Sequence, residues 1–587
     1  MLKNTPFTKS PIATLLLSFA VGAALTFSTP AAFAQTSVAE QETQTHTATS
    51  EKNMVASVHP LATQAGLQAF KDGGNAVDAA VATALTLGVV DGFNSGIGGG
   101  CFILIRSSDG EFFAIDGREM APAAAHAKMY VEAKSKFKNP SQIGALASGV
   151  PGALAAFHEA ATKHGKLKFS KLIEPGAKIA DEGFELSAAY TGRLNQAQKS
   201  MRQFPGSLDI FFRESDGKHS PYATGETLKQ KDLAQTYRKI SSLGPSWFYN
   251  GPFATATEAW MKDNGGIMTS RDFANYHTVN RKPIRTTYRG FEIVGFPPPS
   301  SGGVHVAQIL NILEHFELKQ LYKDDPAAMY HVVAEAMKFA FADRAKWLGD
   351  PDFVNVPSGL VEKEYAKQIA AKIKLDTVTD ATPGNPPNAD SKFFEKHTTH
   401  IATADADGNW VAITSTVNTT FGAKFVVPGL GVVMNNQMDD FVAIPGKTNS
   451  YGLVGSEKNW VEAKKRPLSS MSPTIVLKDG QPILTVGAAG GPKIITEVLW
   501  AIVNHIDLEM PIGKAVAQPR LHHQWAPKDL LLESSFDKAL EEKLKSRNHS
   551  IKRSSVMGIC QAISFDPVTK KFTGTHDPRT TGAAAGE

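Results

Sequence analysis

Two short apolar segments joined by a turn carry the residues that are best suited to carry out a chemical reaction. Residues 397–418 read HTTHIATADADGNWVAITSTVN, in which two β-forming runs flank the turn-forming pair Asp407 and Gly408. This pattern predicts a β-hairpin. If Asp407 and Gly408 form a two-residue loop, Thr398 lies opposite Val417 at the open end of the hairpin. Hydroxyl and amide side chains are therefore expected to gather there.

A threonine at this open end becomes a nucleophile only beside a base, because its hydroxyl is almost never ionised near neutral pH. An α-amino group, with a pKa of about 8, is such a base, but only a chain terminus has one free. Cleavage between His397 and Thr398 would therefore create a catalytic threonine, with Thr416 and Asn418 beside it. Residues 376–397, just upstream, begin with a stretch rich in Pro, Asn and Asp, which predicts an exposed, mobile linker before the cleavage site.

The overall composition excludes several other classes of function. The 587 residues carry a net charge of +4, which gives no sign of a nucleic-acid-binding protein. Cys101 and Cys560 are too few for a disulfide framework or a Cys-rich zinc site, although a single bridge between them is an alternative. Near matches to phosphate-loop, zinc-protease, dinucleotide-binding and serine-hydrolase motifs each lack a required residue or its context. We expect no metal and no organic cofactor.

The N-terminus has the pattern of an export signal. Lys3 and Lys9 precede an apolar run at 12–27, and residues 32–34 (AFA) offer small side chains for cleavage. We expect removal of residues 1–34, which places the mature protein in the periplasm or outside the cell. An uncleaved membrane anchor is the alternative, although the run is shorter than the roughly 20 residues of a spanning helix. The polar stretch that follows, up to Ser50, is expected to be a flexible lead-in.

The rest of the chain reads as helices followed by strands, which predicts stacked α and β layers. Helices are expected at 61–70, 76–90 and 327–348, a central strand at 101–106, and further strands at 401–404, 410–416, 432–434, 474–477 and 483–486.

Eight segments, in order along the chain, resemble those of the γ-glutamyltranspeptidases, which are self-processing N-terminal-nucleophile hydrolases. They are 73–80 (GGNAVDAA), 95–100 (SGIGGG), 116–122 (DGREMAP), 297–303 (PPPSSGG), 398–400 (TTH), 435–441 (NNQMDDF), 466–473 (RPLSSMSP) and 487–491 (GAAGG). The resemblance implies a four-layer αββα sandwich built from two chains after self-cleavage. The large subunit would be 35–397 and the small catalytic subunit 398–587, held together as a heterodimer.

The resemblance also implies a catalytic role for four residues of this chain. Thr398 would attack the carbonyl of His397 to split the chain, and would then attack γ-glutamyl amides as the new N-terminus. Thr416 matches the family threonine whose hydroxyl contacts the nucleophile. Gly490 and Gly491 match the oxyanion hole, a role that suits glycine because two backbone N–H groups can approach the ligand closely.

A γ-glutamyl group presents an α-carboxylate and an α-ammonium, so its pocket needs hydrogen-bond donors at one end and acceptors at the other. By resemblance, Arg118, Ser469 and Ser470 bind the carboxylate. Asp440, Gln437 and Asn418 bind the ammonium, and Asp439 is interpreted as the structural member of the acidic pair.

The loop-forming stretch between Phe441 and Trp460 is flanked by these proposed ligands and favours a covering loop. It resembles the lid of some family members, with Tyr451 as the shielding aromatic residue. By excluding water, such a lid would favour transfer of the acyl group over hydrolysis. An ordinary surface loop is the alternative.

The sequence therefore predicts an exported enzyme that hydrolyses glutathione and related γ-glutamyl compounds, or transfers their γ-glutamyl group to amino acids or dipeptides. No nucleic-acid partner is expected, and no membrane partner once the signal is removed. The alternatives are an acylase of the same fold acting on glutaryl or cephalosporin side chains, and a periplasmic binding protein for γ-glutamyl peptides without chemistry.

Overall fold

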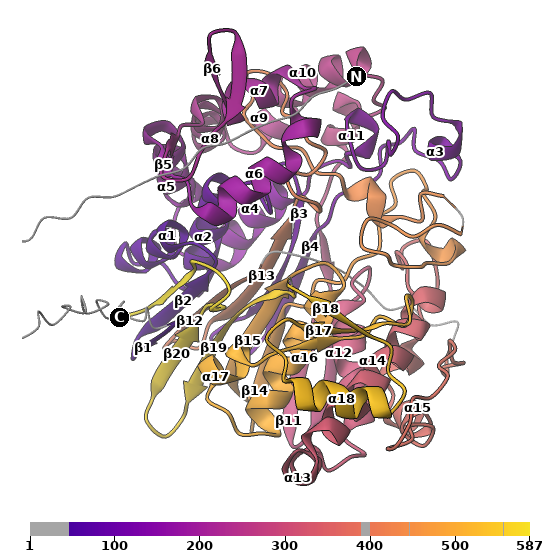
Figure 1. Ribbon diagram of the computed structural model, residues 1–587. Coiled ribbons are helices and arrows are strands. Elements are labelled where there is room, and N and C mark those ends of the chain that lie inside the picture. The colour runs from indigo at the N-terminus through magenta and orange to yellow at the C-terminus, as the bar shows by residue number, and fades with distance from the viewer. Residues whose placement is uncertain (1–45, 389–399, 445, 556) are drawn as a thin grey trace, which may run out of the picture. The chain divides into compact units, whose positions relative to one another are not determined.

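Two seven-stranded antiparallel sheets face each other, and helices cover the outer side of each (Figure 1). The computed structural model describes residues 46–388, 400–444, 446–555 and 557–587, and His46–Glu587 form one compact unit. This arrangement is the predicted four-layer αββα sandwich. The predicted signal peptide, residues 1–34, lies outside the described residues.

The first sheet is built mainly around the predicted hairpin. Its strands, in spatial order, are β21 (Ala583–Ala585), β2 (Asn53–Ser57), β12 (His400–Asp405), β13 (Trp410–Thr416), β3 (Gly100–Arg106), β4 (Phe112–Gly117) and β9 (Val279–Arg281). The second sheet is β1 (Thr47–Ser50), β20 (Lys571–Thr575), β19 (Ile559–Asp566), β15 (Gln481–Ala489), β14 (Thr474–Lys478), β11 (Phe291–Gly295) and β10 (Ile284–Tyr288).

The residues of β3 show why these layers stack. Ile103 and Ile105 join the core under the helices of the first sheet, whereas Phe102 and Leu104 join the core between the two sheets. Successive side chains of a strand point to opposite faces, so a strand that is apolar throughout must be covered on both. The predicted central strand at 101–106 is confirmed.

Helices cover the outer face of each sheet. Packed on the first sheet are α1 (Pro60–Lys71), α2 (Ala76–Val90) and α4 (Ala153–His164), and on the second α12 (Gly302–Leu313) and α16 (Lys493–Ile506). Further helices pack on these, namely α5 (Phe169–Glu182) on α2, α8 (Lys231–Leu243) on α5 and α14 (Pro326–Trp347) on α12. Helix α2 begins in a capping box, because the Asn75 side chain accepts from the N–H groups of Val77 and Asp78, and Asp78 accepts from the Asn75 N–H at 2.9 Å. The three predicted helices are confirmed.

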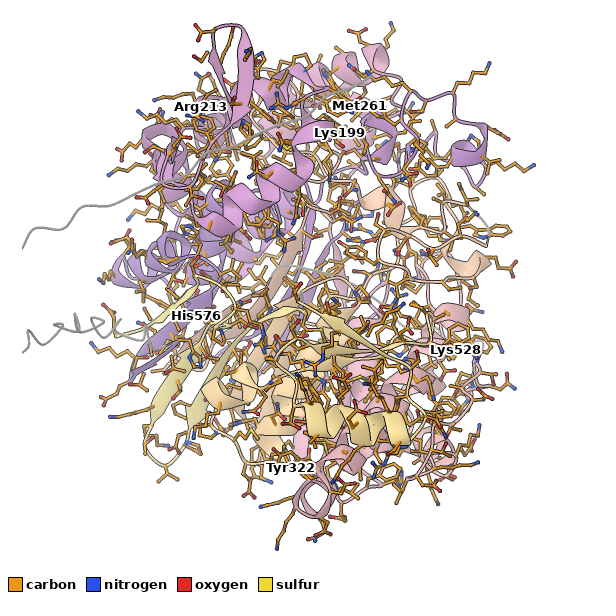
Figure 2. The ribbon with its side chains drawn as sticks, in the orientation of Figure 1. Lys199, Arg213, Met261, Tyr322, Lys528 and His576 are labelled. Atoms are coloured by element: carbon orange, nitrogen blue, oxygen red, sulfur yellow. The ribbon has the colours of Figure 1, made fainter. Side chains whose placement is uncertain are left out.

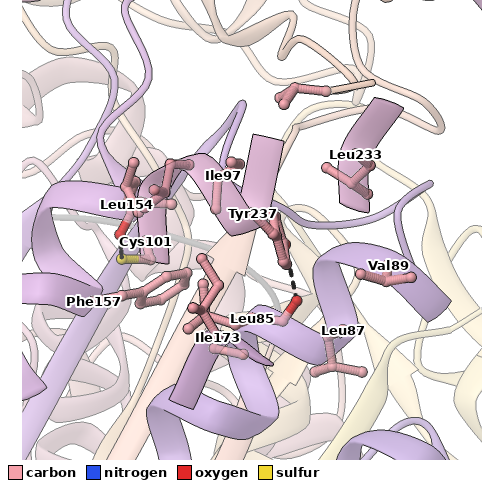
Figure 3. Close-up of a cluster of buried hydrophobic side chains, with 14 of the residues drawn as sticks. Leu85, Leu87, Val89, Ile97, Cys101, Leu154, Phe157, Ile173, Leu233 and Tyr237 are labelled. Carbon is pink, nitrogen blue, oxygen red and sulfur yellow. Dashed lines mark hydrogen bonds between the residues drawn. The ribbon is translucent and has the colours of Figure 1, made fainter. Parts of the chain in front are cut away.

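Figure 2 shows that side chains fill the space between the helices and strands. Lys199 and Arg213, which are labelled in that figure, are exposed on the surface. Figure 3 shows part of the core under the first sheet, where the Tyr237 hydroxyl donates to the carbonyl oxygen of Leu85 at 2.9 Å. Cys101 lies buried in this core and Cys560 in the core of the second sheet, and both are free thiols. The alternative of a bridge between them is therefore wrong.

The predicted register of the hairpin is wrong by one residue. His400 pairs with Thr414, because the loop between β12 and β13 has three residues instead of two. The Asp405 N–H donates to the Asn409 carbonyl at 3.0 Å, the Gly408 N–H donates to the Asp405 carbonyl at 3.1 Å, and Gly408 takes a φ of +92°. A type I turn followed by a left-handed glycine is the usual form of a three-residue hairpin loop.

Two further expectations are corrected. Residues 432–434 form no strand, and only an isolated bridge joins Val426 to Val433. The predicted lead-in ends earlier than expected, since Thr47–Ser50 pair with β20 as an edge strand. Backbone hydrogen bonds of the ladder order this short polar segment although it has few apolar side chains to bury.

The predicted linker has neither helix nor strand over its described part, residues 376–388, and its remaining residues lie outside the described ranges. Among the helices that the structure describes, none combines the length and the apolar character needed to cross a membrane.

Candidate active site

A cavity of about 550 Å³ opens where β13 and β15 end. Its lining brings together five of the predicted site residues, namely Thr416, Asn418, Tyr451, Gly490 and Gly491. Thr416 ends β13 and Asn418 follows it, Tyr451 lies in the loop between Phe441 and Trp460, and the two glycines lie in the turn from β15 to α16. His397 and Thr398, the predicted cleavage site and nucleophile, lie outside the described residues.

Thr416 and Asn418 form one wall of this cavity. The Thr416 hydroxyl accepts a hydrogen bond from the Asn418 N–H at 2.7 Å, and the Asn418 side chain donates to the Asn436 carbonyl at 3.0 Å. A Cβ atom on Gly99 would lie 1.8 Å from the carbonyl oxygen of Thr416. The glycine run 95–100 therefore lets the backbone approach the back of this wall, and it acts there as a packing element.

Gly490 and Gly491 occupy the turn between β15 and α16. Their φ angles of +145° and +62° are unfavourable for other residues. The described residues offer neither backbone N–H a hydrogen-bond partner, and both glycines line the cavity. Two free adjacent N–H groups at a cavity wall can stabilise a developing oxyanion.

A smaller inner pocket lies beside the cavity and is lined by three of the six predicted ligands of a γ-glutamyl group. Its lining includes Asn418, Asp440 and Ser470, together with Tyr451 and Gly491, which it shares with the cavity. Its free volume is about 10 Å³, so it is closed in this structure. Two pockets that share a wall at the oxyanion turn can hold an acyl group on one side and its leaving group on the other.

Asp440 is the acidic centre of the inner pocket. It ends a 3₁₀ turn, Gln437–Asp440, and its carboxylate accepts from Arg118 at 2.6 Å and from the Gln437 amide at 3.1 Å. Burial raises the pKa of Asp440, and the neighbouring Arg118 guanidinium opposes this rise. Arg118 also forms an ion pair with Glu119 at 3.4 Å.

Two of the predicted ligands, Ser469 and Gln437, each carry a buried polar atom without a hydrogen-bond partner among the described residues. They are the hydroxyl oxygen of Ser469 and the amide oxygen of Gln437. A buried polar atom without a partner costs about 1–3 kcal/mol, a cost that a bound ligand with the complementary group would remove. One is a donor and the other an acceptor, as the predicted α-carboxylate and α-ammonium sites require.

The covering segment, residues 442–444 and 446–459, packs over both pockets through Tyr451. The Tyr451 hydroxyl donates to the Asn418 carbonyl at 2.9 Å, and its ring contacts the turn at Gly491. Asp439 anchors the segment by accepting from the Ser450 N–H at 2.9 Å. Asp439 therefore has a structural contact in this segment, and the lid itself stays a prediction.

Arg344 also lines the inner pocket, although no sequence motif singles it out. It lies near the end of α14 and donates to the Ser470 hydroxyl at 3.3 Å. In the sequence it is one of several basic residues near a helix C-terminus, where a cation is ordinary, so no local signal distinguishes it.

A buried cluster that no sequence motif indicates consists of His331, Glu335 and His549, whose possible ligand atoms lie within 4.8 Å of one another. The two histidine rings share a hydrogen bond of 2.7 Å, and Lys338 donates to Glu335 at 2.6 Å. These contacts join α14 to the loop before β18 (Ile551–Ser554) and leave the cluster internally paired.

Comparison with known proteins gives concordant results. The family model described as Gamma-glutamyltranspeptidase matches residues 62–587. The chain is similar to the glutathione hydrolase proenzyme of Escherichia coli (strain K12), with 41% identity over 582 residues, covering 99% of this chain and 98% of that protein.

Solved structures include the cephalosporin acylase from Bacillus halodurans, with a TM-score of 0.82 and 29% identity over 92% of this chain and 96% of that chain. A chain of Helicobacter pylori γ-glutamyltranspeptidase aligns with a TM-score of 0.53 and 40% identity over 57% of this chain and 94% of that chain.

Proposed function

The chain belongs to the γ-glutamyltranspeptidase family, and we propose that Thr398 carries out its γ-glutamyl transfer and glutathione hydrolysis. The observation that carries this proposal is the inner pocket, which Asp440 and Ser470 line. Behind these two residues, the Ser469 hydroxyl and the amide oxygen of Gln437 have no hydrogen-bond partner among the described residues, and the Gln437 amide donates to Asp440 at 3.1 Å. Their chemistry matches the two charged groups of a γ-glutamyl donor, and the oxyanion turn lies beside them.

Self-cleavage is the first proposed step. The Thr398 hydroxyl adds to the carbonyl carbon of His397, the C–N bond between the two residues breaks, and the acyl group moves to the hydroxyl oxygen as an ester. Water then hydrolyses the ester, leaving a carboxylate on His397 and a free α-amine on Thr398. Continuing the observed register of β12 and β13 would set Thr398 opposite Thr416, which supports a contact between the two hydroxyls.

Turnover then uses the new amine as the base. It takes the proton from the Thr398 hydroxyl while the oxygen attacks the γ-carbonyl carbon of the donor, and the N–H groups of Gly490 and Gly491 stabilise the oxyanion. The resulting ammonium returns the proton to the leaving amine as the amide bond breaks. Water or an acceptor amine then attacks the γ-glutamyl ester and restores the Thr398 hydroxyl.

Substrate recognition follows from the charges of the inner pocket. The α-carboxylate would bind Arg118, Ser469 and Ser470, and the α-ammonium would bind Asp440, Gln437 and Asn418. Asp440 is buried and already pairs with Arg118 at 2.6 Å, so a substrate ammonium would be its second charged partner in the pocket.

An acylase acting on glutaryl or cephalosporin side chains is the second candidate, favoured by the structural similarity to a cephalosporin acylase. A glutaryl group has no ammonium to offer to Asp440 and Gln437, so their acceptors favour the γ-glutamyl donor. Comparing the hydrolysis of γ-glutamyl and glutaryl anilides tests this choice. A kcat/KM for the glutaryl anilide equal to or above that for the γ-glutamyl anilide would overturn the proposed substrate.

The proposal includes a processed, exported heterodimer of a large subunit, 35–397, and a small subunit, 398–587. The proenzyme name of the E. coli relative supports processing, and the N-terminal sequence pattern supports export to the periplasm or beyond. A denaturing gel of the purified protein tests the first part. Two bands favour this enzyme, whereas one full-length band would favour the third candidate, a periplasmic binding protein.

A further inference from the structure

We propose that Arg344 is a second guanidinium that binds the α-carboxylate of the γ-glutamyl donor, together with Arg118, and so sets the preference for donors that carry this group. The inference rests on the proposed function and identifies a specificity-determining residue of the same site. It starts from the hydrogen bonds of Arg344, which place the guanidinium beside the serine pair already assigned to the carboxylate.

The position of Arg344 is held by two serine hydroxyls. Its Nε donates to the Ser301 hydroxyl at 2.9 Å, and its Nη2 donates to the Ser470 hydroxyl at 3.3 Å. Ser301 in turn donates to the backbone carbonyl of Ser469. The segment 297–303 therefore orients Arg344 toward the serine pair, which gives that motif a role beyond beginning α12.

The charge of Arg344 has no counterion among the described residues. Only 4% of the residue is exposed, and no described carboxylate lies within the 4.0 Å that defines an ion pair. Arg118 differs, because Asp440 at 2.6 Å and Glu119 at 3.4 Å already balance its charge. A buried cation held only by neutral hydroxyls is unfavourable until an anion binds beside it.

Arg344 nevertheless stays charged at neutral pH. Burial lowers its pKa to about 10, and the nearby Asp440 carboxylate opposes the shift. The lining of the inner pocket therefore offers a cation at Arg344 and an anionic acceptor at Asp440. Asn418 and Ser470 add polar side chains to the same lining. An α-amino acid carries both complementary charges on one carbon atom, which is the group that such a pocket fits.

The test compares two anilides that differ only in the α-carboxylate, a γ-glutamyl anilide and a 4-aminobutyryl anilide. For Arg344→Gln, we expect kcat/KM for the γ-glutamyl anilide to fall about 10- to 100-fold, mainly through KM, as for the loss of a charged hydrogen bond. The value for the 4-aminobutyryl anilide should change less than about threefold. Arg344→Lys, which keeps the charge but loses the planar fork, should recover part of the preference.

The matched control is Arg289→Gln, a partly buried arginine paired with Asp507 that lines neither pocket. It should leave the ratio between the two substrates unchanged. Product inhibition gives an independent readout, since Arg344→Gln should weaken inhibition by L-glutamate and leave inhibition by 4-aminobutyrate unchanged. If Arg344→Gln does not fold or self-cleave, Arg344→Lys must still lower the ratio between the two substrates.

Provided that the wild-type protein hydrolyses the γ-glutamyl anilide, two results would overturn the inference about Arg344 without affecting the proposed function. One is an equal fall in kcat/KM for both substrates, which indicates a structural role for Arg344. The other is an unchanged ratio in both variants. A wild-type protein that hydrolyses neither anilide would instead refute the proposed function.

Discussion

The oxyanion turn offers the sharpest test of the catalytic geometry through Gly491→Ala. A Cβ atom at this position would lie 2.7 Å from Cδ1 of Tyr451 and 2.8 Å from its Cε1. The ring cannot move freely because the Tyr451 hydroxyl is bonded to the Asn418 carbonyl at 2.9 Å. We therefore expect the backbone at the turn to shift and to withdraw one N–H group from the oxyanion.

The magnitude follows from two separate costs. An L-residue at the φ of +62° observed for Gly491 costs about 1–2 kcal/mol of folding stability. Loss of one oxyanion donor costs about 2.7–4 kcal/mol of transition-state stabilisation, which lowers kcat about 100- to 1000-fold. The assay is kcat on a γ-glutamyl anilide, measured on fully cleaved protein, with urea unfolding of the same preparation.

Gly480→Ala is the matched control, because Gly480 has a φ of +75° and a Cβ atom added there would meet nothing within 4 Å. It should lose a similar amount of stability and keep the wild-type kcat. The reasoning is refuted if Gly491→Ala keeps a kcat within about threefold of wild type, or if Gly480→Ala loses as much activity.

Three further predictions concern the pocket, the lid and the buried histidines. Ser469→Ala should raise KM for the γ-glutamyl anilide about 10-fold with little change in melting temperature, because it removes a donor that has no hydrogen-bond partner among the described residues. An unchanged KM would contradict its role. Tyr451→Phe removes the hydrogen bond to Asn418 and should raise hydrolysis relative to transfer to an acceptor dipeptide, as measured by product analysis, whereas an unchanged ratio would count against a lid that excludes water. Burial and the neighbouring His331 lower the pKa of His549 to about 3, so its neutral form contributes stability that is complete above about pH 6.5 and is lost as the pH falls toward 3. Relative to pH 7, the wild-type free energy of unfolding in urea should fall at pH 4.5 by about 2 kcal/mol more than that of His549→Gln, and equal losses would contradict this linkage.

Most of the layered fold could be predicted because it follows from local patterns. The apolar run of β3 and the capping box of α2 specify their structure within a few residues. The hairpin register could not be settled in this way, since Asp407 and Gly408 fit a two-residue loop as well as the three-residue loop that forms. The difference depends on hydrogen bonds between Asp405 and Asn409 that only the folded loop contains.

The candidate site shows the same limit. Arg118, Asp440 and the two glycines of the oxyanion turn could be predicted as site residues because they lie within family motifs. Arg344 lies 126 positions before Ser470 and belongs to none of those motifs, so only tertiary packing brings its guanidinium to the serine pair. Long-range electrostatic partners of this kind have no periodicity or spacing that a sequence pattern can carry.

The central claim is that a peptide bond breaks before Thr398 and that the liberated amine serves as the catalytic base. N-terminal sequencing of the smaller fragment, from wild-type protein and from Thr398→Ala, tests it most directly. The claim predicts a wild-type fragment that begins Thr-Thr-His and a variant that remains uncut and inactive. A fragment that begins elsewhere, a variant that still splits between positions 397 and 398, or full activity in an uncut chain would contradict it.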